Sequence, residues 1–467
     1  MTETGTASPR PPYPAHDALW HLVMMGVLTP DHAPCGWEVP TPERPTRVAL
    51  IDTSVAAGHP NLDPALDRDL AFDLFSTRLG GFPWRAPAEP LGNLGLGDSG
   101  AVVAGLPHCT ALLVDLKARL RPGQPARIGT IRTATGATFS AHGTAAAGLI
   151  AARPARTSAI EAHLPGATEG ELALPYMGVD PTAELVPIST NFDPDPEALI
   201  LAFLYADLIR ADVIVLPRIL PDPLRTVPEL PAHDINGTAF ADAVAPSPLG
   251  QAQWEMWDEL AQLIVNISQR RPVVCAAGNA NEEFGIYPAN LAADDNGVIA
   301  VGAVNARGWP CSYSPASGLT IWAPSSDGER FDRAEVRLDQ RRHDYDPTGV
   351  PADNQNHRFS PFSLIATDVP GRGGYATSPF PGPEPDEGLR EYGSYFCRFG
   401  GTSGAAALIG GFLALGLSLG RWSRNAGGIA ARDWLLTQAH RLAEGRGDAR
   451  MPVLGGGAPV LPDDSSP

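Results

Sequence analysis

Residues 399–411, "FGGTSGAAALIGG", decide the fold, because they place a hydroxyl pair at the start of a long apolar run. The pair is Thr402 and Ser403, and the run continues with "FLALGLSLG". Such a run is a membrane span, a buried core helix, or a buried helix whose first turn presents a nucleophile. A span needs ~20 apolar residues, whereas glycines interrupt this shorter run, so the pattern favours a buried helix.

Apolar strand-like segments alternate with helix-like segments on both sides of this run. The expected strands are 47–55, 111–116, 183–190, 212–217, 272–279 and 297–304, and the expected helices are 16–28, 142–152, 197–209, 252–268, the run from 403, and 430–443. Continuous apolar strands between helices are typical of a parallel sheet covered on both faces. The sequence therefore predicts an α/β fold, with a predominantly parallel β-sheet, helices on both faces and surface insertions.

Composition shifts divide the chain into three parts. Residues 1–45 are Pro-rich and predict an extension that is partly disordered or regulatory. Residues 46–445 predict one folded domain with insertions near 60–135, 220–250 and 325–390. The Gly- and Pro-rich residues 446–467 predict a flexible tail.

Charge and cysteine usage exclude several classes of protein. A net charge of −18 and a pI near 5.0 argue against a nucleic-acid partner, which requires a basic face. The five cysteines are scattered without zinc-ligand spacing, which fits a reducing compartment. The N-terminus lacks the pattern of a secretory signal. We therefore expect a cytoplasmic protein that contacts neither nucleic acid nor membrane.

Four polar motifs fall at the ends of the expected elements. They are "IDTS" with Asp52, "AHGT" with His142, "AAGN" with Asn279 and "GGTSGAA" with Ser403. Taken singly, each residue has an ordinary interpretation as a turn former, a core histidine or a helix cap. Together they supply the carboxylate, base, oxyanion donor and nucleophile that acyl transfer requires.

The order of these motifs resembles that of the subtilisin-like serine proteases, or subtilases. The resemblance also includes "VALIDTSVAAGHPNL", "HGTAAAGLIAA", "GVDPTAELVPI", "PVVCAAGNAN" and "YPANLAADDNGVIAVGAV", and it extends over about residues 46–445. It implies a parallel-sheet α/β fold and serine endopeptidase activity through a covalent acyl-enzyme. Ser403 would be the nucleophile, His142 the general base, Asp52 its orienting carboxylate and Asn279 the oxyanion donor.

The resemblance implies no required cofactor and a protein or peptide as substrate. No metal ligands are expected; calcium is conceivable at the polar runs 344–349 and 353–358, but no alternating carboxylate ladder indicates it. His59, in "GHPNL", is interpreted as structural.

One departure from the family pattern lies at 217–219. Subtilases usually have Ser-Leu-Gly on this edge of the substrate cleft, whereas this chain has Pro217, Arg218 and Ile219. Proline lacks the backbone N–H that would pair with a substrate. Pro217 and Arg218 are therefore candidate substrate-binding residues, with a specificity that differs from ordinary members.

Three functional hypotheses remain open at this point. The chain is a general protease, a processing enzyme with narrow specificity, or an interaction protein that kept the fold and lost turnover. An activating or inhibiting protein partner, or gating of the cleft by residues 1–45 or by the 60–135 insertion, is a further expectation.

Overall fold

We analysed a computed structural model of the chain. It describes residues 18–38, 44–74, 96–120, 141–158, 171–190, 195–220, 248–326, 363–369, 374–375, 395–442 and 449–462. Most of the three expected insertions, namely 75–95, 121–140, 221–247, 327–362 and 376–394, lie outside these residues, as do both proposed calcium runs.

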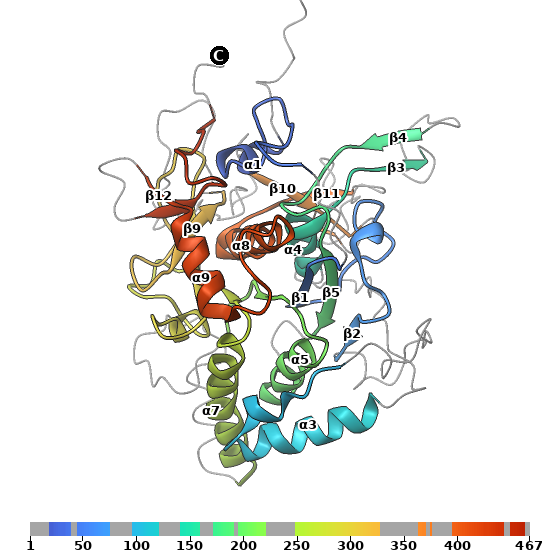
Figure 1. Ribbon diagram of the computed structural model, residues 1–467, viewed down its shortest axis with the longest axis vertical. Helices are drawn as coiled ribbons and strands as arrows, with labels where there is room; N and C mark the ends of the chain where they lie inside the picture. Colours follow the sequence, from blue (N-terminus) through green and yellow to red (C-terminus); the bar gives the residue numbers. More distant parts are fainter. Residues whose placement is uncertain are drawn as a thin grey trace, which may run out of the picture.

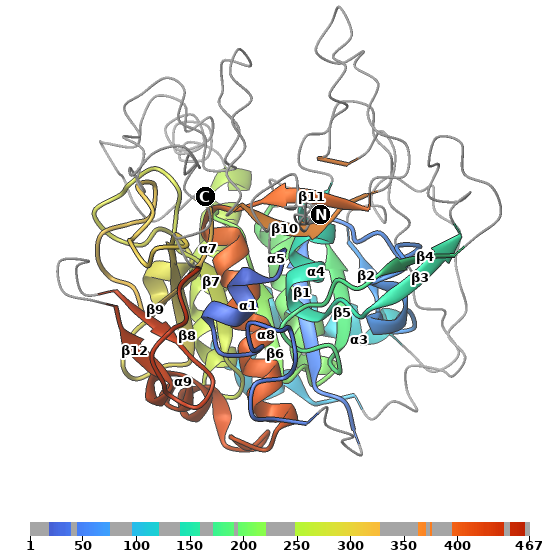
Figure 2. The same cartoon turned by 90° about the horizontal axis from the view of Figure 1, so that it is seen from above.

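A seven-stranded sheet forms the centre of the molecule, with strand order β2-β5-β1-β6-β7-β8-β9 (Figures 1 and 2). Every pair of neighbours in it is parallel. The strands are β1 (Arg47–Asp52), β2 (Phe72–Asp73), β5 (Glu184–Ser189), β6 (Val213–Leu216), β7 (Val273–Ala276), β8 (Val298–Val304) and β9 (Ile321–Pro324). The predicted parallel α/β fold is therefore confirmed.

Helices cover both faces of this sheet, as Figure 2 shows. Successive strand side chains point to opposite faces, so Val48 and Leu50 join one apolar core while Ala49 and Ile51 join the other. The first core includes side chains of α1 (Trp20–Met24), α4 (His142–Ala151), α8 (Gly401–Ser418) and α9 (Gly427–Thr437). The second includes α3 (Pro107–Arg119), α5 (Pro196–Leu208) and α7 (Pro248–Ser268).

Helix α8 is formed by the long apolar run that contains Ser403. By length and composition it could cross a membrane, but 89% of it is buried inside the protein. It packs against α4 and against β6, β7, β8 and β9. The expectation of a buried core helix is correct, because the sheet and α4 supply the apolar surroundings that its composition requires.

Short elements complete the fold. Two antiparallel strand pairs flank the sheet: β3 (Ala155–Ser158) with β4 (Glu171–Leu174), and β10 (Leu364–Thr367) with β11 (Phe396–Phe399). Short 3-10 helices also occur, namely η1 (Asp63–Ala65), η3 (Ser99–Val103) and η4 (Ala289–Leu291). The pair β10–β11 leads directly into α8, so it lies at the same end of the molecule as the start of that helix (Figure 2).

Two local expectations are wrong. Residues 111–116, expected as a strand, belong to helix α3, which begins at Pro107 and buries Cys109, Leu113 and Leu116 on one face. This spacing is helical, and the short window concealed it. The expected helix 430–443 ends at Thr437, and its last part is strand β12 (Ala439–Arg441).

The ends of the chain pack more closely than their composition suggested. Strand β13 (Arg450–Pro452) pairs with β12, and Met451 is fully buried, so this part of the expected flexible tail is a packed strand. Within the N-terminal extension, α1 is buried, and the Met25 carbonyl accepts a hydrogen bond from the Leu454 N–H at 2.9 Å. The two ends therefore hold each other against the first core.

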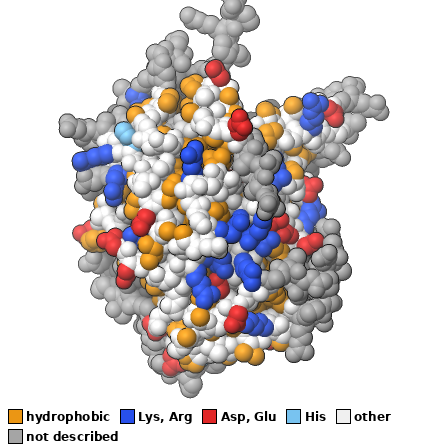
Figure 3. Space-filling model, in the orientation of Figure 1, with side chains coloured by type: hydrophobic (Ala, Val, Ile, Leu, Met, Phe, Trp, Pro, Cys, Tyr) orange, Lys and Arg blue, Asp and Glu red, His pale blue; other side chains and the backbone are white. Residues whose placement is uncertain are grey.

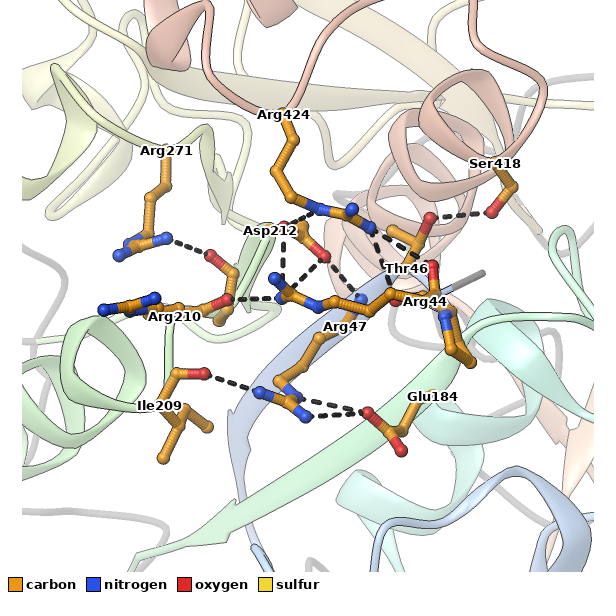
Figure 4. A network of polar contacts seen from close by, with 12 residues as sticks. Arg44, Thr46, Arg47, Glu184, Ile209, Arg210, Asp212, Arg271, Ser418 and Arg424 are labelled. Atoms are coloured by element: carbon orange, nitrogen blue, oxygen red, sulfur yellow. Dashed lines mark hydrogen bonds and ion pairs between the residues drawn. The ribbon is translucent and has the colours of Figure 1, made fainter. Parts of the chain in front are cut away.

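A buried carboxylate ties several segments together at the beginning of the strands. Asp212, just before β6, accepts hydrogen bonds from Arg424 Nε at 2.7 Å, from the Arg47 backbone N–H at 2.8 Å and from Arg44 Nη2 at 3.3 Å (Figure 4). The side chains of Arg44 and Arg424 are 38% and 33% exposed, and basic side chains gather on the face drawn in Figure 3. This arginine cluster around Asp212 fixes the entry into β1 and β6.

Candidate active site

The end of β1 holds the first half of the site. Asp52, the last residue of β1, is fully buried, and its two carboxylate oxygens lie 2.9 and 2.8 Å from His142 Nδ1. His142 is the first residue of α4 and is 7% exposed. A carboxylate accepts only, so Nδ1 carries the proton and the imidazole is held in one tautomer.

Hydrogen bonds from backbone N–H groups to threonine side chains join the two segments that carry this pair. The Gly143 N–H donates to Thr53 Oγ1 at 2.8 Å, and the Ala56 N–H donates to Thr144 Oγ1 at 3.0 Å. Gly143 permits the close approach, because a Cβ there would lie 2.3 Å from the Thr53 carbonyl oxygen. The Thr53 N–H also donates to Asp52 Oδ1 at 2.6 Å. The turn after β1 is therefore bound to the start of α4.

The second half of the site lies at the start of α8. Ser403 falls in the first turn of this helix and is 9% exposed. The first N–H groups of a helix have no intrahelical acceptor, and the N-terminus carries partial positive charge. A negative charge that develops beside Ser403 is consequently favoured by the helix.

Asn279 is joined to the residue before Ser403. Its Oδ1 accepts hydrogen bonds from the Thr402 N–H at 2.8 Å and from Thr402 Oγ1 at 3.1 Å. Because the Thr402 N–H can only donate, the side-chain atom of Asn279 that faces it is the amide oxygen. The NH₂ group of Asn279 is therefore turned away from Thr402. Gly401 has a φ of +70°, and a Cβ there would lie 3.1 Å from Asn279 Oδ1. A side chain at position 401 would disturb both residues.

An aromatic side chain connects the two halves. The Phe399 ring meets the His142 ring edge-on, with centroids 5.1 Å apart, and Phe399 ends the strand that leads into α8. From β10, Thr367 Oγ1 donates to the Thr144 carbonyl at 2.7 Å. The structure thus brings Asp52, His142 and the segment bearing Ser403 to one end of the sheet.

The two candidate substrate residues lie just after β6. Both are buried, and the Arg218 side chain is turned inward: Nη2 donates to Thr190 Oγ1 at 2.6 Å, and Nε lies 4.0 Å from Asp52 Oδ1. Ile219, the next residue, is 40% exposed. The substrate-binding role of Pro217 and Arg218 stays a prediction.

The residues that surround the Asp52 carboxylate were not predicted from the sequence. The contacts of Thr53, Thr190, Arg218 and Phe399 depend on packing between distant segments. One signal was present in the sequence, since an arginine directly after an apolar strand requires a buried partner or an exit to solvent.

His59 is held by structural contacts. Its Nε2 lies 2.7 Å from the Tyr395 carbonyl oxygen, and its Nδ1 accepts from the Asn61 N–H at 3.1 Å. Nε2 therefore donates, and the ring is neutral. Burial lowers the pKa of His59 to about 4, which agrees with the structural interpretation.

The described residues hold no group of three or more His, Cys, Asp or Glu side chains that could bind a metal ion. All five cysteines are free thiols. Burial raises the pKa of Cys275, just before the Asn279 loop, well above its usual range. This thiol is a small buried hydrophobic group in β7.

The arrangement is suited to acyl transfer. A hydroxyl at a helix N-terminus, an imidazole oriented by a buried carboxylate, and an amide held by the residue before the hydroxyl are the groups of a hydrolase of the serine type. Strand ends of a parallel sheet are where such groups converge.

Comparison with known proteins agrees with this class. A family model described as "Subtilase family" matches residues 44–452. The chain therefore belongs to the subtilase family and is a serine protease that acts on proteins or peptides. No curated protein shows significant sequence similarity to it.

Several solved structures are similar to this chain. The nisin leader peptidase NisP from Lactococcus lactis is 15% identical, with 94% of this chain and 92% of that chain covered and a TM-score of 0.48. A cold adapted subtilisin-like serine proteinase is 12% identical, with 93% and 97% covered and a TM-score of 0.44. The serine protease of Aeromonas sobria is 17% identical, with 86% and 51% covered and a TM-score of 0.45.

Proposed function

We propose that Asp52, His142 and Ser403 form the catalytic triad and that Asn279 supplies the oxyanion donor. The observation that carries this proposal is the pair of short contacts, 2.9 and 2.8 Å, between the buried Asp52 carboxylate and His142 Nδ1. This contact leaves Nε2 as the nitrogen that can accept a proton from a hydroxyl.

The reaction then follows from the chemistry of these groups. Ser403 Oγ attacks the peptide carbonyl carbon while His142 Nε2 takes the hydroxyl proton. The oxyanion accepts hydrogen bonds from the Asn279 NH₂ group and the Ser403 N–H. His142 returns the proton to the leaving amine, the C–N bond breaks, and water hydrolyses the acyl-enzyme by the same steps. This chemistry requires no cofactor.

Labelling with a fluorophosphonate probe tests the assignment. The wild-type protein should form a covalent phosphonyl adduct at the Oγ of Ser403 with loss of fluoride, and Ser403→Ala should not. Ser418→Ala is a matched control, because its serine lies at the other end of the same helix. Equal labelling of wild type and Ser403→Ala would overturn the triad. No labelling of a folded wild type would favour the hypothesis of a silent interaction protein.

We further propose a cytoplasmic processing protease of narrow specificity. The five free cysteines support this setting. Pro217, which lacks an N–H on the expected substrate edge, supports a restricted specificity. A digest of casein and a peptide library separates the hypotheses: cleavage of few library members and little casein is expected, whereas rapid general digestion would refute narrow specificity.

Control by a protein partner or by the N-terminal extension is part of the same proposal. The described part of the extension packs on the C-terminal segment through Met25 and Leu454. Deletion of residues 1–17, which precede α1, tests a gating role without removing this packing. Unchanged peptide hydrolysis would count against gating by that segment.

A further inference from the structure

Arg218 is a buried, permanent positive charge beside the proposed catalytic carboxylate. It is 2% exposed, and it is among the largest fully buried side chains of the described residues. Its Nε lies 4.0 Å from Asp52 Oδ1, and its Nη2 donates to Thr190 Oγ1 at 2.6 Å. Because a guanidinium does not lose its proton in proteins, this charge is present at every working pH.

The contacts of Thr190 join three strand ends at this point. The Thr190 N–H, just after β5, donates to the Asp52 carbonyl oxygen at 2.8 Å. Arg218 follows β6, which pairs with β1 on the side opposite to β5. The guanidinium, which follows β6, therefore contacts the end of β1 and the residue just after β5.

Arg218 and His142 share one carboxylate. The negative charge of Asp52 stabilises the imidazolium that forms when His142 takes a proton. A cation close to Asp52 offsets part of that charge and repels the imidazolium. The base therefore remains neutral, and so able to accept a proton, at a lower pH than it would without Arg218.

We propose that Arg218 is a positioning residue that holds Asp52 and sets the acidic limit of activity. The proposal rests on the proposed triad and deepens it. It differs from the expectation of a substrate contact, because the guanidinium acts through Asp52 and His142.

The other charged or titratable groups around the pair do not supply this cation. From the β10–β11 side, Asp368 accepts from the Val369 and Tyr375 N–H groups, both at 2.8 Å. Burial raises the pKa of the Tyr375 phenol and of the Cys397 thiol well above the usual range, and Asp52 and Asp368 raise that of Tyr375 further. Both groups are neutral, so Arg218 is the cation beside Asp52 among the described residues that face the pair.

Two substitutions separate charge from shape. Arg218→Met removes the charge and keeps most of the volume, whereas Arg218→Lys keeps the charge and loses the planar fork. Arg432→Met is a matched control: Arg432 is also buried, but it donates to the carbonyls of Ala293, Asp294 and Asn296, before β8.

The measurement is the rate of fluorophosphonate labelling of the full chain between pH 4 and 9. Arg218→Met should move the acid limb of the profile upward by about half a pH unit or more, because His142 then keeps its proton to higher pH. Arg218→Lys and Arg432→Met should leave the limb in place, although either lowers thermal stability.

A second readout keeps the test independent of activity. In Ser403→Ala protein, NMR titration of the His142 imidazole should show the same upward movement when Arg218→Met is added. If the triad proposal fails and no labelling occurs, this titration still decides the role of Arg218. If Arg218→Met does not fold, Arg218→Gln replaces it in both measurements.

An unmoved acid limb and an unmoved imidazole titration in the folded Arg218→Met protein would overturn the proposal and leave Arg218 a structural residue. Equal movement in Arg218→Lys and Arg218→Met would overturn it too, because geometry rather than charge would then be responsible.

Discussion

Asp52 and Asp212 are both buried carboxylates, and they lie at opposite ends of two neighbouring strands. Asp52 ends β1, whereas Asp212 immediately precedes β6, which pairs with β1. Asp212 receives two partly exposed arginines and a backbone N–H at hydrogen-bond distance. Asp52 has a histidine at 2.8 Å and a fully buried arginine at 4.0 Å.

The difference teaches what each end of the sheet is built for. The arginine partners of Asp212 stay charged at every working pH, so their contacts with it hold segments together. The main partner of Asp52 is an imidazole, a group that can take up and release a proton. A group whose charge changes during turnover can take part in catalysis. Among the described residues, Asp52 accordingly has one permanent cation nearby, at 4.0 Å, whereas Asp212 has two at hydrogen-bond distance.

The largest expected effect is a loss of activity when Asp52 is substituted, with no such loss when Asp212 is substituted. Asp52→Asn should lower kcat by about 10⁴-fold, because an amide does not enforce the imidazole tautomer or stabilise its charged form. Asp212→Asn is the matched control and should leave kcat/KM near the wild-type value. Kinetics on one peptide substrate measure both, and equal losses in the two variants would remove the distinction.

The reverse effect is expected in stability. Asp212→Ala should lower the free energy of unfolding by about 2 kcal/mol, because Arg44 and Arg424 lose a partner and the Arg47 N–H loses its acceptor. The two arginines are partly exposed and can rehydrate, which limits the loss. Urea unfolding measures it, and an unchanged midpoint would show that the arginine cluster around Asp212 contributes nothing to stability.

The smallest effect concerns a buried ionisable group with no counter-charge. His21 in α1 is fully buried, and its ring nitrogens have no hydrogen-bond partner among the described residues. Burial lowers its pKa from 6.5 to about 3. The unfolded chain therefore binds a proton below pH 6.5 that the folded chain rejects, and stability is lost as pH falls through this window.

His21→Leu should remove that part of the pH dependence. At pH 5 the wild type should have lost about 2 kcal/mol more than the variant, relative to pH 8. Urea unfolding of both proteins at the two pH values measures the difference, in which the contribution of His59 cancels. Parallel pH dependence in the two proteins would contradict the burial of His21 without a counter-charge.

Much of the fold could be predicted from the sequence, because buried parallel strands leave a local signal. The segments containing β1, β5, β6, β7 and β8 are continuous apolar runs, and each was identified within a few residues of its observed bounds. The prediction of a strand at residues 111–116 was wrong, because a short apolar run fits a strand or one face of a helix equally well. Strand β13 was not predicted, because its pairing with β12, and not its composition, gives it structure.

The candidate site, like the fold, has one part that was predicted from the sequence and one part that was not. The motifs around Asp52, His142, Asn279 and Ser403 are local and in one family's order, so the sequence by itself determined the class of chemistry. The inward turn of Arg218 toward Asp52 and Thr190 was decided only by the tertiary structure. The direction of a long charged side chain depends on which segments supply a partner for it, and those segments lie far apart along the chain.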